Sequence, residues 1–185
     1  MAAIDAANAE DPTTIEVRGA VRPKELAHAE LMGEWLDRLD PGAGDAQRLA
    51  ARAHHLRRWS LPRASYPEGR AGYLRWRTAL RKQHADEVAG ILRAVDYDDA
   101  TIARTQAIVR KEGLGLDPDV QTHEDALCLV FLETQLAALV DDLEDDKMVE
   151  VIKKTAAKMS PEALALVSHL PMRESDRALM ARALG

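Results

Sequence analysis

The feature that most constrains the fold is a long apolar segment near residue 130. Residues 126–132 are apolar without a break, and residues 136–140 continue the pattern. A helix that is apolar on most sides is buried on most sides. We therefore expect a central helix over residues 122–140, ended by the acidic patch at residues 141–146.

The remainder of the chain also favours helices. Aromatic residues make up only 4% of it, whereas β-sheet cores draw on aromatic and β-branched side chains. Alanine and leucine, both strong helix formers, are abundant. We expect an all-α bundle of seven to nine helices, with Asp45, Asp98 or Asp99, and Ser160 as N-caps. The other helices are expected over residues 2–10, 23–39, 45–59, 70–95, 98–111, 145–159, 161–170 and 174–184, with residues 17–21 irregular and residues 60–69 and 113–120 as loops.

The length of 185 residues is typical of one domain. We expect an N-terminal arm (1–22), a core that holds the site (23–142) and C-terminal helices (143–185). The single cysteine, Cys128, excludes a disulfide framework and a cysteine-based zinc cluster within one chain. No apolar run reaches the roughly 20 residues of a membrane span, and the first residues lack signal-peptide features. We expect a cytoplasmic protein without a membrane partner; the sequence leaves its oligomeric state open.

The basic residues are concentrated in one part of the chain. Nine of them lie between Arg52 and Lys82, where Glu68 is the only acid, so this window carries +8 in a chain of net charge −6. Eight of the nine are arginines, whose planar guanidinium suits phosphate or carboxylate. The window therefore indicates an anion-binding site or a solvated face that pairs with acidic helices elsewhere.

Aromatic side chains are interleaved with these arginines over residues 61–77. Aromatic rings among arginines can stack on a base or a guanidinium, or they can fill the core. Two prolines restrict the conformations of this loop. We expect the substrate-binding side chains to come from this region, namely Arg57, Arg58, Arg63, Tyr66, Arg70, Tyr73, Trp76 and Arg77.

Histidines and acidic residues near this window are candidates for chemistry. His54 and His55 would point about 100° apart on a helix, and the register allows either one to face a cleft. His84 follows Arg77 by seven residues and shares nearly the same helix face. Glu124 and Asp125 stand at the expected start of the buried helix. Lys111-Glu112 ends the helix before it. The candidate catalytic residues are His55, His84, Lys111, Glu112, Glu124 and Asp125.

Many of these residues carry a resemblance to a known family. The chain resembles domain-of-unknown-function family 4202 over about residues 2–180, and the family implies no activity. The matching positions are residues 51–63, Tyr66-Pro67, Arg70, Gly72-Tyr73, Trp76-Arg77, His84-Ala85, Lys111-Glu112, Gln121, Glu124-Asp125, residues 128–133, and the opening residues 3–8 with Asp11-Pro12.

The order of the histidines is more distantly similar to that of the HD-type metal-dependent phosphohydrolases. Their pattern is a lone His, a His-Asp pair, a further His and a distant Asp on a buried helix. The resemblance implies an HD-domain-like fold and a divalent metal ion. This chain departs from the pattern where His55 or Leu56 replaces the Asp of the pair, which removes negative charge that would hold the ion. It also departs where Lys111-Glu112 stands in place of a His. The implied metal ligands are His28, His54, His55 and Asp125.

Two classes of function follow, and the sequence does not decide whether the chain is an enzyme. In the first, the arginines hold a phosphorylated small molecule, such as a nucleotide, and a metal ion or the imidazoles assist its hydrolysis. In the second, the cleft binds an anionic metabolite, or the basic window binds RNA, without turnover. The acidic remainder of the chain argues against extensive nucleic-acid binding. A purely structural interaction protein would leave the interleaved arginines and aromatics unexplained.

Overall fold

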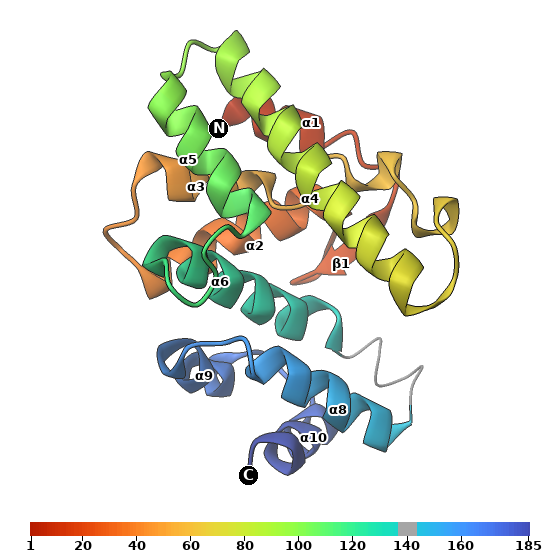
Figure 1. Cartoon of the computed structure of the whole chain (residues 1–185). Coiled ribbons are helices and arrows are strands. Elements are labelled where there is room, and N and C mark those ends of the chain that lie inside the picture. The colour runs from red at the N-terminus through yellow and green to blue at the C-terminus, as the bar shows by residue number, and fades with distance from the viewer. Residues whose placement is uncertain (137–143) are drawn as a thin grey trace.

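The computed structural model describes residues 1–136 and 144–185, and this part of the chain is built from helices and one small hairpin (Figure 1). The prediction of an all-α bundle is confirmed. Among the described helices, none combines the length and the apolar character that crossing a membrane requires. The α-helices are α1 (Ala2–Asn8), α2 (Lys24–Leu39), α3 (Asp45–Ala53), α4 (Gly69–Ala94), α5 (Asp99–Arg110), α6 (Pro118–Thr134), α8 (Asp145–Ala156), α9 (Pro161–Leu166) and α10 (Glu174–Leu184).

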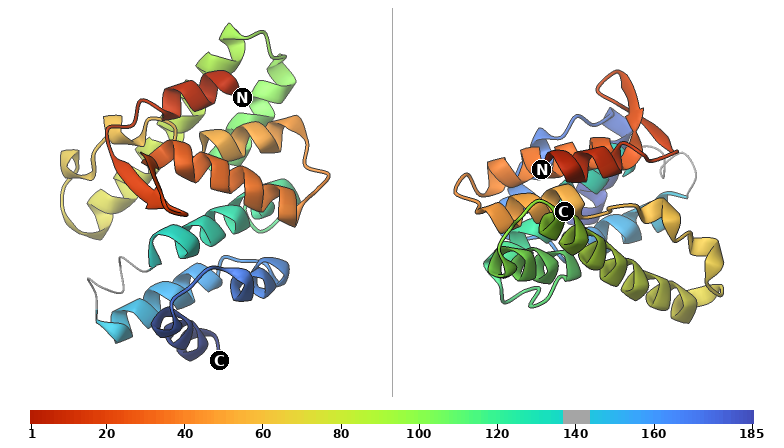
Figure 2. Two further views of the ribbon diagram at one scale, coloured as in Figure 1. Left: turned by 180° about the vertical axis from the view of Figure 1, so that it is seen from behind. Right: turned by 90° about the horizontal axis from the view of Figure 1, so that it is seen from above.

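Helix α6 lies between two groups of helices, α1–α5 on one side and α8–α10 on the other (Figures 1 and 2). One apolar cluster joins α1, α3, α4 and α5 around Leu56 and Ile108. A second cluster joins α2 and α6 to the C-terminal helices around Leu129 and Met148. The apolar segment is therefore central, as its composition predicts. Helix α6 ends at Thr134, short of the expected end at residue 140, and residues 137–140 lie outside the described residues.

Helix α6 begins earlier than expected, at Pro118 instead of Thr122. The side chain of Asp117 caps it by accepting backbone N–H groups of the first turn, at 3.0 and 3.4 Å. Proline at the first helical position needs no hydrogen-bond partner for its nitrogen. The early start places Glu124 and Asp125 inside the helix, where both are buried, and not in its first turn.

The helix expected over residues 45–59 ends at Ala53. The carbonyl of Leu56 bonds the ring of His84 instead of a helical N–H, with 2.7 Å between the oxygen and Nδ1. Arg57 then adopts the left-handed conformation (φ 50°), which a continuing helix does not allow. A contact with α4 thus holds the turn that replaces the expected last part of the helix.

The remaining N-cap predictions are mostly confirmed. Ser160 accepts the N–H of Ala163, and Asp98 accepts that of Thr101. The N-cap of α3 is Gly44 and not Asp45, which is already helical. Differences of one residue at a helix end are common because helix termini fray.

Residues 17–21, expected to be irregular, belong to a hairpin. Strand β1 (Thr14–Val17) pairs antiparallel with β2 (Ala20–Pro23), and the hairpin lies beside α2 (Figure 2). The two turn residues, Arg18 and Gly19, both have positive φ, at 52° and 79°. Two-residue turns of this kind are favoured in hairpins because their twist matches that of the strands. The Arg-Gly pair was the only sequence signal for this turn.

The loop at residues 60–69 is ordered, as its prolines predict, because α4 holds it at two points. The indole Nε1 of Trp76 donates to the carbonyl of Leu61 at 2.9 Å. The backbone at Pro67 lies so close to Gly72 that a Cβ at this glycine would overlap the Pro67 carbonyl oxygen. The first turns of α4, which lead into its arginines, are therefore tied to this loop.

Two glycines of α4 are expected to respond oppositely to alanine. Gly72→Ala should destabilise the chain by about 1–3 kcal/mol, because the new methyl group forces the Pro67 backbone away. Gly90→Ala should stabilise it by about 0.5–1 kcal/mol, because this exposed helical position has open space around it. Urea denaturation of both variants measures the two changes. An equal effect of the two substitutions would contradict the packing of the loop on Gly72.

Candidate functional site

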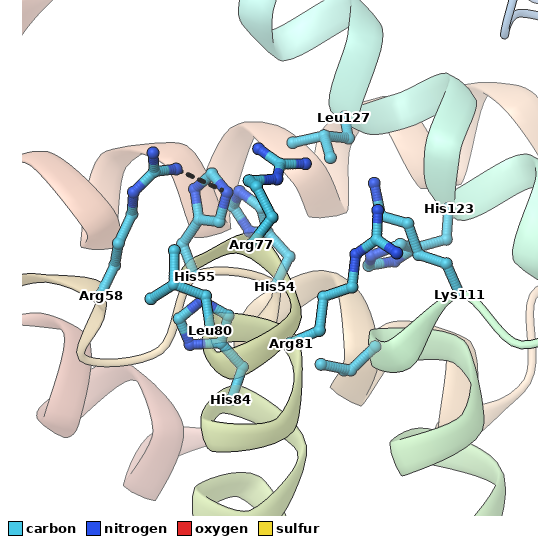
Figure 3. Close-up of a pocket in the computed structure, with 11 residues that line it drawn as sticks. His54, His55, Arg58, Arg77, Leu80, Arg81, His84, Lys111, His123 and Leu127 are labelled. Carbon is cyan, nitrogen blue, oxygen red and sulfur yellow. Dashed lines mark hydrogen bonds between the residues drawn. The ribbon is translucent and has the colours of Figure 1, made fainter. Parts of the chain in front are cut away.

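Imidazole and guanidinium groups from several elements surround one cavity, which we call the inner chamber (Figure 3). The space that it encloses is about 20 Å³, enough for about one water molecule, so a larger group can lie only at its mouth. The turn after α3, the middle of α4, the end of α5 and α6 form its walls. The polar residues that line it are His54, His55, Arg58, Arg77, Arg81, His84, Lys111 and His123.

Helix α4 supplies three of these side chains from one face. Arg77, Arg81 and His84 are spaced by four and three residues, so they lie above one another on successive turns. Figure 3 shows the side chains of Arg77 and Arg81 extending towards α6, while His84 lies deeper. The spacing of Arg77 and His84 in the sequence predicts this common cavity.

The imidazoles of the inner chamber are uncharged at neutral pH. Burial is the main cause: it lowers the pKa of His55 and His123 to about 3 and that of His84 to about 4. It also lowers the pKa of His54 far below its usual value, helped by the neighbouring His55 ring. A neutral imidazole offers one N–H donor and one bare nitrogen acceptor.

Several of the bare nitrogens face the chamber without a protein partner. In His84 the Nδ1 atom must carry the proton, because its contact at 2.7 Å is the carbonyl of Leu56, which can only accept. Its Nε2 is then a buried lone pair with no partner in the described chain. Both ring nitrogens of His54 and the Nδ1 of His123 are likewise buried and unpartnered there. Unpaired buried polar atoms cost stability, so their retention indicates a ligand or ordered water.

Three guanidinium groups at the chamber lack an acidic partner within the described residues. Arg77 and Arg81 form no hydrogen bond or ion pair with that part of the chain. Arg58 contacts the Nε2 of His55 at 3.0 Å and lies 5.2 Å from the ring centroid of Trp76. Burial lowers the pKa of Arg58, although arginine remains charged at neutral pH. The mouth of the chamber is therefore positive.

Lys111 contributes no free charge, because it forms an ion pair with Glu124 across the chamber wall. Both side chains are buried. Burial would raise the pKa of Glu124, but the Lys111 ammonium outweighs it and lowers that pKa, so the carboxylate stays ionised. Lys111 itself adopts the left-handed conformation that ends α5 (φ 60°). The structure thus brings together two of the predicted catalytic residues as a neutralised pair.

A second cavity, the outer chamber, adjoins the inner one and shares His55, Arg58, Arg77, Lys111 and Leu127 with it. Its volume is about 230 Å³. Its other walls come from α6, the end of α8 and the residues that follow α8. These additional lining residues are Glu124, Cys128, Phe131, Gln135, Thr155 and Lys158.

Behind His55 lies a group that could hold a metal ion. The ligand atoms of Glu25, His28 and His55 lie within 4.8 Å of one another. The Oε2 atom of Glu25 is 3.2 Å from the Nδ1 of His55 and 3.6 Å from the Nδ1 of His28. Two histidines and one carboxylate form a common ligand set for catalytic zinc, which leaves one position open.

Hydrogen bonds fix which ring nitrogen of His28 is free to bind a metal ion. The hydroxyl of Thr134 donates to the carbonyl of Val130 at 2.7 Å, so its oxygen accepts the Nε2–H of His28 at 3.3 Å. The Nδ1 of His28 is then a bare nitrogen that faces the carboxylate of Glu25. Two acceptors that face each other favour a cation between them, and a fixed tautomer of this kind is typical of metal-binding histidines.

Arg58 opposes metal binding through His55. Its N–H donates to the Nε2 of His55, so the proton of the neutral ring lies on Nδ1, towards Glu25. A metal ion at Nδ1 would displace that proton to Nε2, where the guanidinium could no longer donate. The donor types therefore fit a divalent ion, but Arg58 must turn away when one binds.

The other predicted binding residues lie outside the two chambers. Arg57 pairs with Glu10 at 3.4 Å and Glu87 at 3.5 Å. Arg63 donates to the carbonyl of Tyr66 at 2.9 Å, within its own loop. Arg70 and Tyr73 are exposed near the start of α4, and Trp76 anchors the loop to that helix. Of the eight substrate-binding candidates, the chambers include Arg58 and Arg77.

Asp125 and Glu112 are also separate from the chambers and from the Glu25 group. The Oδ1 atom of Asp125 accepts the N–H of Ser160 at 2.9 Å and the amide of Gln121 at 2.9 Å. These bonds join α6 to the start of α9. Glu112 is exposed and lies 3.7 Å from Arg110. His54, an expected ligand, lines the inner chamber instead of joining the metal-binding group.

Glu25, Arg81 and His123 belong to the site but are not among the site residues that the sequence predicts. Glu25 and His28 form a Glu-x-x-His pair on one face of α2, a spacing that could have drawn attention to the carboxylate. His123 lies four residues before Leu127, and both line the inner chamber. Arg81 follows Arg77 by one helical turn. Only the fold brings these side chains together, since they come from α2, α4 and α6.

Comparison with known proteins places the chain in one family. A family model described as "Domain of unknown function (DUF4202)" matches residues 1–180, and the chain belongs to that family. No curated protein and no solved structure matches it. The resemblance to the HD-type phosphohydrolases therefore remains a prediction.

The neutral imidazoles predict how stability depends on pH. An unfolded histidine binds a proton below about pH 6.5, whereas folded His84 does so only below about pH 4. Between these values the unfolded chain binds more protons, so stability should fall as the pH is lowered. His84→Gln, which keeps a donor for the Leu56 carbonyl, should reduce this slope by up to about 1.4 kcal/mol per pH unit.

Urea denaturation between pH 7 and pH 4 measures the slope. His169→Gln is the control, because this side chain is exposed in the folded chain. His169→Gln should have the same slope as the unchanged chain. If His84→Gln also had that slope, His84 would not be held neutral in the interior.

Proposed function

We propose that this member of the DUF4202 family binds the phosphate group of a small molecule at the mouth of the inner chamber, where it meets the outer chamber. The observation that supports it most is the pair of guanidinium groups of Arg77 and Arg81, which lack acidic partners in the described residues. Acidic residues outnumber basic ones in this chain, 31 to 25, so partners were not scarce. Guanidinium groups gathered at a cavity without a counterion favour an anion from outside.

The chemistry of the chamber suits phosphate in particular. The planar fork of arginine donates two parallel hydrogen bonds to neighbouring phosphate oxygens. Arg58 adds a third guanidinium at the mouth.

A small molecule fits better than nucleic acid. Strand binding relies on a broad basic face that neutralises several phosphates in a row. Here the unpaired cations converge on a cavity, whereas Arg57 is engaged with acids of its own chain. The net charge of −6 also opposes an extended contact with a polyanion.

Binding of orthophosphate should depend on α4. Orthophosphate is expected to raise the melting temperature in a concentration-dependent manner, as ligands of the native state do. Arg77→Ala and Arg81→Ala should each weaken binding by about tenfold or more, because each removes a hydrogen bond to a charged group. Arg75→Ala is the matched control, since Arg75 is exposed on the same helix and does not line either chamber. Equal weakening in all three variants would contradict the proposal.

A second candidate function is hydrolysis of the bound phosphoester. The observation that favours it is the position of the Glu25, His28 and His55 group, because His55 belongs both to this group and to the two chambers. A divalent metal ion held there would supply Lewis acidity, which makes water a better nucleophile at neutral pH. Water would add to phosphorus, and the ester oxygen would leave as the alcohol after taking up a proton. The guanidinium groups would stabilise the charge that develops on the phosphoryl oxygens.

Metal binding should respond in opposite directions to two substitutions. In calorimetric titration with Zn²⁺, Glu25→Gln should weaken binding by at least about tenfold, because the only carboxylate of the ligand set is lost. Arg58→Gln should tighten it, because a positive charge leaves and the new amide oxygen can accept the Nε2–H of His55. Glu162→Gln, at an exposed position of α9, serves as the control.

Release of orthophosphate from phenyl phosphate, measured with and without the metal ion, tests the reaction itself. Hydrolysis that requires the ion and disappears in Glu25→Gln is the expected result. If Glu25→Gln bound zinc as tightly as the unchanged chain, this group would not be the metal site and the hydrolytic function would lose its basis.

A further inference from the structure

The outer chamber has no role in binding a phosphate group alone. It extends the cavity from the shared residues Arg58 and Arg77 along α6 towards the end of α8. The shared guanidinium groups lie at the junction, so a molecule with its phosphate there has room for the rest of its structure in the outer chamber. What lines this chamber therefore decides which phosphate ester fits.

Beyond the ion-paired Glu124, the wall on α6 presents three apolar or uncharged side chains. Leu127 and Phe131 are four residues apart on one helix face, and both line the outer chamber. Cys128 lies beside them, and burial raises the pKa of its thiol to about 12, so it carries no charge at neutral pH. Phe131 is the only phenylalanine of the chain, and its side chain is half-buried.

The other cations that line the outer chamber do not favour a second anionic group of the ligand deep in that chamber. Lys111 is already paired with Glu124. Lys158, on the opposite wall, is exposed to solvent. Of the unpaired cations that line the outer chamber within the described residues, Arg58 and Arg77 lie at the junction that the phosphate group would occupy, and Lys158 is exposed to solvent.

We infer that the ligand is a phosphate ester of an apolar or aromatic alcohol, whose organic group lies in the outer chamber against Leu127 and Phe131. This inference rests on the proposed function, because it places the phosphate at Arg58 and Arg77. An aromatic group suits the wall especially, because ring-to-ring contact adds to the burial of apolar surface. A free phosphate or a polyhydroxylated ester would leave the wall in contact with water.

Three phosphates of similar charge test the inference by calorimetric titration: orthophosphate, glycerol 1-phosphate and phenyl phosphate. The unchanged chain should bind phenyl phosphate about tenfold or more tightly than glycerol 1-phosphate, as burial of a phenyl ring predicts. Phe131→Ala should remove most of this preference and leave the affinity for orthophosphate unchanged. Leu116→Ala, at a side chain that is 92% exposed, is the control and should keep the preference.

The results distinguish failure of the inference from failure of the proposed function. Equal binding of the two esters, with orthophosphate still dependent on Arg77, would overturn the inference alone. Binding of none of the three phosphates would overturn the proposed function, and the inference with it. If Phe131→Ala does not fold, Phe131→Leu and the comparison of esters in the unchanged chain carry the test. Either an unchanged preference in Phe131→Leu or equal binding of the two esters by the unchanged chain counts against the inference.

Discussion

The structure depends on keeping imidazole rings uncharged in its interior while positive guanidinium groups stand over them. Protonated rings would repel Arg58, Arg77 and Arg81 and would carry charge into an apolar setting. Burial prevents this by lowering the pKa of His54, His55, His84 and His123. The rings can therefore pack beside one another, with 4.1 Å between the ring centroids of His54 and His55. A cavity of neutral acceptors beneath a positive mouth is the result.

One local event creates this arrangement, namely the end of α3 at Ala53. After α3 ends, the bond between the Leu56 carbonyl and His84 holds the chain as it turns under α4. The turn directs His54 and His55 into the chamber together, which a continuous helix would not allow because neighbouring residues would point about 100° apart. The same turn places His55 between the chamber and Glu25. The cavity and the metal-binding group are thus consequences of one backbone conformation.

The sequence predicts the parts of this structure that depend on local pattern. The all-α class, the central apolar helix, the caps at Asp98 and Ser160, and the shared cavity of Arg77 and His84 all follow from spacing and residue type. The turn after α3 could not be predicted, because the contact that holds it joins Leu56 to His84, 28 residues away. Arg57 and Arg63 belong to the same basic window as Arg77, yet acids and a carbonyl of the chain engage them. Sequence alone does not reveal which arginines form ion pairs or hydrogen bonds within their own chain. Glu25 was missed for a similar reason, since only the fold brings α2 up to His55.

The central claim is that the guanidinium groups of α4 and the imidazoles below them form one site for an anion. A crystal structure of the chain grown with tungstate, an analogue of phosphate that anomalous scattering locates, tests it most directly. The account predicts tungstate between Arg58, Arg77 and Arg81, with the rings of His54 and His84 beneath it. A crystal in which tungstate lies elsewhere, or in which Arg77 and Arg81 pair with carboxylates of their own chain and leave no cavity, would contradict the account.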